Sequence, residues 1–299
     1  VELQSGAQSR RSSDVGEEVP TNIIDDETLD QQSGLSSWTE AAVATFDLGK
    51  RYGRVEALSG LTMTAPRGEV FGFLGPNGAG KTTAVKLLLG LAQPTSGQAW
   101  VLGAPAGHRE TRRRVGYLPE LFRYQDWLSA REVLNLHADL MGMRHARKEA
   151  IDLVLETVGL ASRSEDRVAG YSKGMQQRLG LAVALLGRPE LIFLDEPTSA
   201  LDPVGRHDVR IIIRELKARG STVFLNSHLL SEVELVCDRV AIVSRGHVFT
   251  HGSLDELLGE MRSVRIKATG ITDAALSAMR TFGACLLYTS PSPRDRQKS

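Results

Sequence analysis

Short, almost continuously apolar runs alternate along the middle of the chain with segments in which apolar residues recur every three or four positions. Val209, Ile212, Ile213 and Leu216 follow this helical spacing, which predicts a helix that covers one face of a sheet. Strands that alternate with such helices indicate an α/β domain with a largely parallel sheet. We predict the strands at residues 70–74, 114–118, 191–195, 222–226 and 239–244.

Residues 121–187 depart from this alternation. They carry three helical patterns, at 130–141, 149–160 and 174–186, and no run that is typical of a strand. We therefore predict a helical insertion at about 121–187, inside an α/β domain that spans 39–252.

The two ends of the chain differ from this domain. Residues 1–38 are rich in Asp, Glu and Ser and show no apolar periodicity, so we expect an acidic, disordered leader. Residue 1 is Val, and the segment has neither region of a signal peptide. We expect residues 253–284 to begin a further accessory region that is truncated. Residues 285–299 resemble a translated adapter or vector sequence, with an ordinary Pro- and Ser-rich tail as the alternative.

Composition narrows the possible partners. The chain has 299 residues, 41% of them hydrophobic, which is enough for a substantial core. Its 36 basic and 36 acidic residues balance, so no overall field draws it to nucleic acid, and we expect no nucleic-acid partner. The two cysteines, Cys237 and Cys285, form no metal or disulfide pattern and fit a reducing cytosol. The charge-free apolar stretch at 179–187 is far shorter than the ~20 residues that span a bilayer.

The sequence VFGFLGPNGAGKTT contains a GxxxxGK[ST] motif at Gly75, Gly80, Lys81 and Thr82, between an apolar run and a helical pattern. Glycines in this motif let backbone N–H groups surround phosphate oxygens, and the dipole of the following helix adds to the attraction. Lys81 can reach the β- and γ-phosphates, and the Thr82 hydroxyl can ligate Mg²⁺. A glycine-rich turn before a helix is the alternative, but the flanking strand and helix favour a phosphate loop.

The predicted strand at 191–195 delivers two carboxylates, Asp195 and Glu196, at its carboxyl end. Ligands of parallel α/β sheets bind beyond these ends, so both side chains can face the same phosphates. Asp195 suits the Mg²⁺ shell, and Glu196 can accept a proton from the attacking water; a helix cap is the alternative use of the pair. We predict a nucleotide hydrolase, and we favour ATP because the chain has no NKxD-type guanine motif.

A second segment, YSKGMQQRLGLAVALLGRP at 171–189, also has the pattern of a helix start that can hold an anion. Ser172, Lys173 and Gly174 precede apolar positions at helical spacing. Since the phosphate loop already serves one nucleotide, this second helix start needs another ligand or another role.

With GPNGAGKTT, YSKGMQQRL, LIFLDEPTSALDP and NSHLL in this order, the chain resembles the ATP-binding subunit of an exporter-type ATP-binding cassette (ABC) transporter over residues 45–252. The resemblance implies a P-loop ABC ATPase core with an N-terminal antiparallel β subdomain and an inserted helical subdomain. It also implies a homodimer in which each ATP lies between the phosphate loop of one copy and the signature segment at 172 of the other. A separate membrane permease would hold the subunit at the cytoplasmic side of the cell membrane.

The resemblance implies roles for individual residues. Tyr52 matches the aromatic residue that stacks on adenine, although a Tyr at a strand edge is about as often a core or surface residue. Ser172 and Gly174 match the signature residues that meet the partner's γ-phosphate, and Asp202 matches the Asp of a loop that communicates across the dimer. The implied phosphate-loop contacts, beyond Gly75, are Asn77, Gly78, Ala79, Gly80, Lys81, Thr82 and Thr83.

Two more positions complete the implied site. Glu120 stands where most members of the family carry Gln, at a position that senses Mg²⁺ and touches the membrane subunit. His228 matches the His that contacts the γ-phosphate; a lone His is more often structural, but its place beyond a strand end favours function. The expected metal ligands are Thr82, Asp195 and Glu120, and the expected catalytic residues are Glu196, His228 and Lys81.

Two local features qualify the resemblance. The usual signature LSGGQ is replaced at Tyr171, Lys173 and Met175, so we expect the reciprocal half of a capping box to be lost at Met175 and Lys173 to add charge near the triphosphate. The stretch LFRYQDWL at 121–128 concentrates three aromatic residues just after Glu120. These rings either pack the helical insertion or form a groove for a short helix of the membrane subunit.

Two other classes of function compete with a transport ATPase. A soluble ABC ATPase of DNA repair or translation tends to carry two cassettes, coiled-coil arms or zinc-binding insertions, and this sequence shows none of them. A nucleotide switch without hydrolysis would not need both Glu196 and His228. The sequence therefore favours the transport ATPase.

Overall fold

The computed structural model describes residues 38, 40–121, 123–199 and 201–259, and these lie almost entirely in one compact unit that ends at Leu257. Residues 1–37 of the predicted leader, residues 260–284 of the predicted accessory region and the adapter-like tail fall outside the described residues. In the part that is described, no helix is both long enough and apolar enough to cross a bilayer.

The larger of two sheets has six strands in the order β10-β9-β3-β8-β7-β6. All strands pair in parallel except β10, which is antiparallel to β9. Because β8 lies between β3 and β7, the carboxyl ends of these three strands meet at one edge of the sheet. The strands are β3 (Val70–Leu74), β6 (Val115–Leu118), β7 (Leu191–Asp195), β8 (Thr222–Ser227), β9 (Arg239–Ser244) and β10 (His247–Ser253).

The strands predicted from the sequence are all confirmed, and their ends differ from the prediction by at most one residue. The reason is burial: β3, β7 and β8 are buried along their whole length, so both of their faces had to be apolar. β10 was not predicted, because half-buried residues alternate in it with exposed ones and no long apolar run results.

The smaller sheet is antiparallel, in the order β2-β1-β4-β5, and confirms the expected N-terminal antiparallel β subdomain. β1 and β2 form a hairpin whose turn uses Gly53 at a φ of +59°. The strands are β1 (Val43–Tyr52), β2 (Val55–Ala65), β4 (Ser96–Val101) and β5 (Ala104–Pro105).

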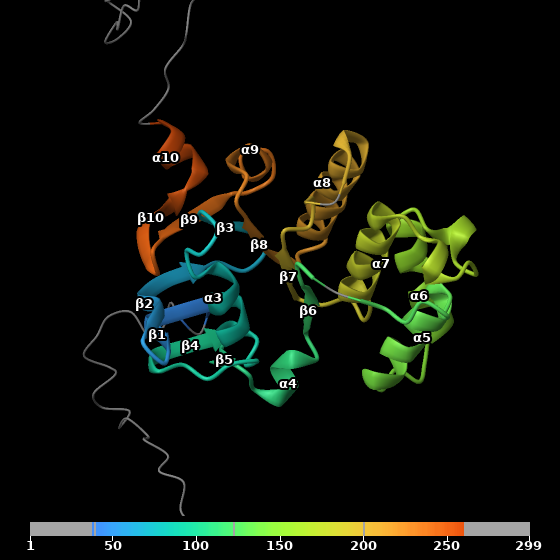
Figure 1. Ribbon diagram of the computed structural model, residues 1–299, viewed down its shortest axis with the longest axis horizontal. Helices are drawn as coiled ribbons and strands as arrows, with labels where there is room; N and C mark the ends of the chain where they lie inside the picture. The colour runs from blue at the N-terminus through green and yellow to red at the C-terminus, as the bar shows by residue number, and fades with distance from the viewer. Residues whose placement is uncertain (1–37, 39, 122, 200, 260–299) are drawn as a thin grey trace, which may run out of the picture. The chain divides into compact units, whose positions relative to one another are not determined.

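Two hydrophobic clusters lie on the opposite faces of the larger sheet. On one face, phenylalanine rings of β3, β7 and β8 pack together and join α3 (Lys81–Leu88) and the smaller sheet. On the other face, the alternate residues of the same strands join α7 (Lys173–Leu185) and α8 (Pro203–Ala218). The predicted helix in α8 is confirmed, with Val209, Ile212, Ile213 and Leu216 all buried. The result is a central sheet covered on both sides (Figure 1).

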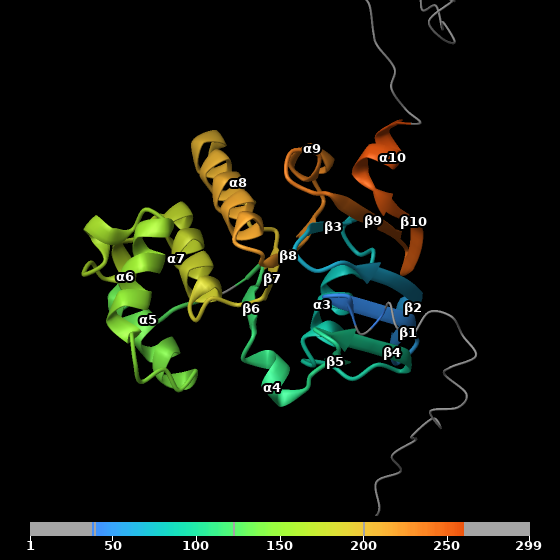
Figure 2. The ribbon, with the colours of Figure 1, turned by 180° about the vertical axis from the view of Figure 1, so that it is seen from behind.

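The predicted helical insertion is present between β6 and β7, and α5 (Ala130–Leu140), α6 (Arg147–Thr157) and α7 lie together in both views (Figures 1 and 2). Arg131 of α5 connects α5 to α6, since its guanidinium donates hydrogen bonds to Asp152 of α6 and also to Glu165. Shorter helices occur elsewhere, at α4 (Arg109–Arg112), α9 (Leu230–Val233) and α10 (Leu254–Gly259).

Candidate active site

The predicted phosphate loop connects β3 to α3. The N-cap of α3 is Gly80, with a φ of +99°, and Gly78 also has a positive φ, of +80°. A Cβ on Gly80 would lie 2.3 Å from the Ala57 carbonyl oxygen, and one on Gly75 would lie 2.3 Å from the Val243 carbonyl oxygen. The loop is therefore folded tightly against β2 and β9, in a form that only glycine permits at these two positions. Its free N–H groups start the helix, where anions bind.

Lys81 begins α3 and is buried. Its Nζ donates hydrogen bonds to the carbonyl oxygens of Gly75, at 2.8 Å, and of Pro76, at 3.4 Å. The ammonium group is thus held inside the curl of the loop, where a phosphate would lie. Thr82 and Thr83 follow it and are half-buried, while Asn77 and Gly78 are exposed and Ala79 is buried.

Asp195 ends β7 and is 1% exposed. Its Oδ1 accepts a hydrogen bond from Asn226 Nδ2 at 2.5 Å, and its Oδ2 has no hydrogen-bond partner among the described residues. Burial is the main cause that raises the pKa of Asp195 to about 6. The charges of Glu120 and Glu196 raise this pKa further, whereas the Asn226 hydrogen bond and the Lys81 charge lower it.

These influences on Asp195 show that the phosphate-loop lysine and three carboxylates lie close together. Glu120 is exposed, and its charge also reaches Tyr117. Burial, with the charges of Asp195 and Glu120, raises the pKa of Tyr117 to about 12. The charge of Glu120 thus reaches both Asp195 and Tyr117, and its role as a metal ligand stays a prediction.

Glu196 and His228 form a direct pair. Glu196 Oε1 lies 2.8 Å from His228 Nδ1, so Nδ1 donates the hydrogen bond when the carboxylate is ionised. The Glu196 side chain is buried, whereas that of His228 is 41% exposed. Glu196 has a φ of +51°, which is rare and strained for a residue with a side chain, and its N–H donates to the Asn226 carbonyl oxygen at 2.9 Å. Such strain is typical of functional sites, because it fixes a side chain in one direction.

Tyr52 lies apart from this pair, at the end of β1. It is 48% exposed, and Lys50 Nζ lies 5.0 Å from the centre of its ring. An exposed ring at a strand end is available for stacking, and its use for adenine stays a prediction.

The signature segment forms the start of α7. Ser172 is the N-cap, and its Oγ accepts a hydrogen bond from the Met175 N–H at 3.2 Å. The reciprocal bond is missing, as predicted for a chain with Met175 in place of Gln. The start of α5 has both bonds, between Ser129 and Glu132. Tyr171 is buried, and its hydroxyl donates to the Arg163 carbonyl oxygen at 2.6 Å.

Ser172 and Gly174 line a cavity of about 490 Å³ that also reaches Asp202. Asp202 is the N-cap of α8, where its Oδ1 accepts a hydrogen bond from the Gly205 N–H at 2.8 Å. No phosphate-loop residue is among the described residues that line the cavity. In both views, β6 and β7 lie between α3 and α7 (Figures 1 and 2). The structure thus groups Ser172, Gly174 and Asp202 in one place and the phosphate loop with the carboxylates in another.

The aromatic stretch after Glu120 contains both packed and exposed side chains. Tyr124 packs against the hydrophobic core, and burial raises the pKa of its hydroxyl. Trp127 and Leu121, by contrast, are 70% and 88% exposed. Phe122 lies outside the described residues.

The sequence reasoning missed Asn226, which touches both Asp195 and Glu196. One signal was available, because an Asn inside an otherwise apolar strand is unusual and needs a polar partner. Gln177 of α7 was also missed; it is buried, and its Nε2 donates to the Pro197 carbonyl oxygen at 3.2 Å, which ties α7 to the segment after Glu196.

A glycine loop between a buried strand and a helix, with an Asp–Glu pair at the end of a nearby parallel strand, defines a P-loop nucleotide hydrolase. Comparison with known proteins agrees. Residues 58–199 match the family described as ABC transporter. The bacitracin transport ATP-binding protein of Bacillus licheniformis is 43% identical, over 72% of this chain and 71% of that protein. The Nod factor export ATP-binding protein I of a Rhizobium species is 38% identical, over 74% of each chain.

A solved structure of the ATP-binding subunit of an ABC transporter superposes with a TM-score of 0.68, at 30% identity, over 81% of this chain and 98% of that one. The chain belongs to the ABC transporter family. It is an ATP-binding subunit of the exporter-related type, with ATPase activity, and the resemblance seen in its motifs is confirmed.

Proposed function

We propose that two copies of this chain bind two ATP molecules between them, with Mg²⁺, and that hydrolysis drives export through a separate membrane permease. In this arrangement the subunit works at the cytoplasmic face of the cell membrane. The names of relatives that act in bacitracin transport and Nod factor export support transport, and the second supports its outward direction.

The separation of the two anion-binding helix starts supports the dimer best. Ser172 and Gly174 line their own cavity with Asp202, and no described residue of the phosphate loop joins them. A nucleotide held at Lys81 therefore needs another copy to supply a signature segment. Two copies placed head to tail complete two equal sites, which is the closed symmetry that most oligomers adopt.

The residues at the carboxyl end of β7 fit Mg²⁺. Asp195 Oδ2 is a buried oxygen without a hydrogen-bond partner, and Thr82 follows Lys81 at the position that ligates Mg²⁺ in phosphate loops. In the described part of the chain, no group of three or more His, Cys, Asp or Glu side chains could hold a metal alone. Mg²⁺ needs none, since it is usually held by one or two carboxylates, phosphate oxygens and water. When bound, it would neutralise charge on the phosphates.

The remaining roles follow from contacts in the chain. Glu196 is the proposed base that accepts a proton from the attacking water, and its bond to His228 fixes the direction of its carboxylate. His228 remains partly exposed and can contact the γ-phosphate through its other ring nitrogen. Lys81 stabilises the charge that develops on the transferred phosphate.

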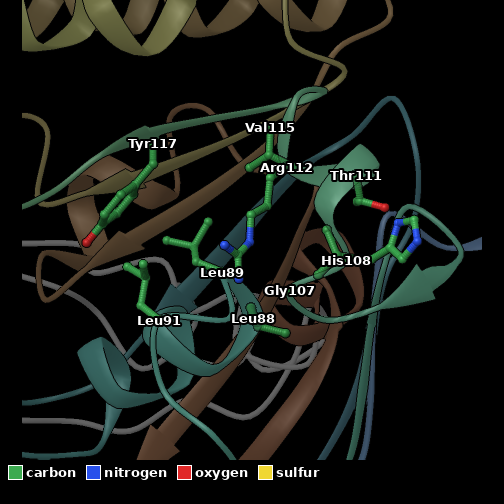
Figure 3. Close-up of a pocket in the computed structure, with 10 residues that line it drawn as sticks. Leu88, Leu89, Leu91, Gly107, His108, Thr111, Arg112, Val115 and Tyr117 are labelled. Atoms are coloured by element: carbon green, nitrogen blue, oxygen red, sulfur yellow. The ribbon is translucent and has the colours of Figure 1, made fainter. Parts of the chain in front are cut away.

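A second surface supports the proposal that the chain binds a permease. A cavity of about 170 Å³ lies between the end of α3 and β6 (Figure 3), where Leu89 and Leu91 approach Val115 and Tyr117. Of the residues that line the cavity, Leu91 is exposed. Leu121 and Trp127 do not line it, but they follow β6 in the sequence and are exposed as well. Exposed apolar side chains suit contact with a short helix from another subunit. A neighbouring reading frame with about six apolar segments of ~20 residues would support this partner.

The substitution Glu196→Gln tests the proposal. It should lower ATP turnover about 10²-fold or more, about 3 kcal/mol of barrier, and leave ATP binding intact. With Mg²⁺ and ATP the variant should become a stable dimer, which analytical ultracentrifugation would detect. The control is Glu190→Gln, which should keep normal turnover. Glu190 is an exposed carboxylate that directly precedes the first residue of β7, at the other end of the strand from Glu196. Near-normal turnover in Glu196→Gln would refute the proposed base, and an ATP-saturated monomer would refute the dimer.

A further inference from the structure

Asn226 joins the two carboxylate residues of the site. It lies on β8 directly opposite Asp195 of β7, and it is 2% exposed. Its Nδ2 donates a hydrogen bond to Asp195 Oδ1 at 2.5 Å, and its backbone carbonyl oxygen accepts one from the Glu196 N–H at 2.9 Å. The backbone contact is available to any residue at this position, so only the contact with Asp195 depends on the asparagine side chain.

In the pair formed by Asn226 and Asp195, two oxygen atoms have no hydrogen-bond partner. Among the described residues, three buried side-chain nitrogen or oxygen atoms lack a hydrogen bond, and two of them are Asp195 Oδ2 and Asn226 Oδ1. A buried oxygen without a hydrogen-bond partner destabilises the folded protein, so two of them on side chains in contact indicate a ligand. Carboxylate and amide oxygens are both hard donors, which suit Mg²⁺ or the water molecules around it.

The orientation of the amide follows from its neighbour. If Oδ1 and Nδ2 of Asn226 were exchanged, an amide oxygen would lie 2.5 Å from a carboxylate oxygen, and both are acceptors. The amide nitrogen must therefore face Asp195, and the amide oxygen stays available. A leucine of similar size would fill this place without leaving a buried oxygen, so packing alone does not account for the asparagine.

We propose that Asn226 is a positioning residue of the Mg²⁺ site. Its amide nitrogen holds one oxygen of Asp195 and so leaves Oδ2 for the ion, and its own Oδ1 accepts a hydrogen bond from a water molecule of the ion's shell. The inference rests on the proposed use of Mg²⁺ with ATP. Partners of this kind orient a ligand without touching the metal, and their loss typically lowers metal affinity 10- to 100-fold.

The test compares ATP affinity in saturating Mg²⁺ with that in EDTA, in a Glu196→Gln background where ATP is not consumed. The ratio of the two affinities measures the coupling between metal and nucleotide. Asn226→Leu should lower this ratio about tenfold or more while the affinity in EDTA stays within about twofold. The spectrum of Mn²⁺ bound with ATP, recorded by electron paramagnetic resonance, should change as well. If the leucine variant does not fold, Asn226→Ala, which is smaller and has no polar side-chain atom, should show the same fall in the ratio.

Thr222→Val is the matched control. Thr222 lies on the same strand, is equally buried, and its Oγ1 accepts a hydrogen bond from the Gly68 N–H at 2.9 Å. This variant should lose stability but keep the affinity ratio. An unchanged ratio in Asn226→Leu, or an equal fall in Thr222→Val, would overturn the positioning role. If the chain with Asn226 intact binds ATP equally well with and without Mg²⁺, the proposed use of Mg²⁺ fails, and this inference fails with it.

Discussion

The helix starts of α3 and α7 are the two proposed anion sites, and they are built in opposite ways. At α3 the N-cap is a glycine in the left-handed region, no side chain caps the helix, and Lys81 is buried against its own loop. At α7 the N-cap is Ser172, whose side chain caps the helix, and both Ser172 and Lys173 are exposed. The first site is formed by enclosed backbone, and the second by exposed side chains.

This difference explains how the two sites can divide one task. The enclosed loop needs precise backbone geometry, because its N–H groups must surround several phosphate oxygens at once. The open start needs only a cap and an accessible surface, since its ligand would arrive already bound to another copy. A chain that presents one enclosed and one open anion site is therefore suited to head-to-tail pairing.

Changing each helix start separately gives the largest expected effect. Lys81→Ala should weaken ATP binding to the monomer at least about 10²-fold, or about 3 kcal/mol, because a buried ammonium in the phosphate loop is lost. Ser172→Ala should leave monomer affinity unchanged but prevent the dimer that ATP induces. Calorimetry of ATP binding and sedimentation with ATP measure the two effects. Equal loss of monomer affinity in both variants would show that the two helix starts serve the same nucleotide within one copy.

Asp195→Asn should give the next largest effect. This effect is on the stability of the folded protein in the absence of nucleotide and metal. Burial raises the pKa of Asp195 to about 6, from about 4 in an unfolded chain. The folded protein therefore binds this proton more tightly, and the stability that it contributes is lost as pH rises from about 4 through 6. Above pH 6.5 the variant should be more stable by about 2 kcal/mol, and below pH 4 the gain should vanish. Urea unfolding in EDTA across this range measures it.

Glu190→Gln is the control for this pH series, because the effect of Glu190 on stability should change with pH in the opposite direction. The hydrogen bond from Arg114 lowers the pKa of Glu190, so its ionised form stabilises the folded protein, and this contribution is lost as pH falls. Because the pair is largely exposed, the effect should be small. A gain in Asp195→Asn that stays constant with pH would mean that its charge is not the cause.

The main part of the fold could be predicted from the sequence because buried elements have a recognisable pattern of apolar residues. β3, β7 and β8 are buried on both faces, so they appear as apolar runs, and α8 shows its buried face at helical spacing. β1, β2 and β4 were expected only as a group, since exposed residues interrupt their apolar positions. β10 has a similar mixture and was not predicted.

The candidate site shows the same division. Glycine spacing and paired carboxylates identified the phosphate loop and Asp195 with Glu196, because these residue types are needed for the chemistry itself. Contacts between residues of different strands have no such pattern in the sequence. The bond between Glu196 and His228 and the bond between Asn226 and Asp195 each join residues about thirty positions apart, and only strand order brings them together.

The smallest expected effect concerns Lys173, where the open helix start departs from the common signature. Its charge lies at the first position of α7, an exposed place that would meet the partner's triphosphate, and it should offset the one-sided cap of Ser172. Lys173→Gly should weaken ATP-induced dimerisation a few-fold, less than about 1 kcal/mol, and added salt should remove the difference because exposed charges are screened. Lys148→Gly, which removes another exposed lysine from the first turn of α6, should leave dimerisation unchanged. If Lys173→Gly and the unchanged chain dimerise equally well at low salt, this lysine does not contribute to the shared site.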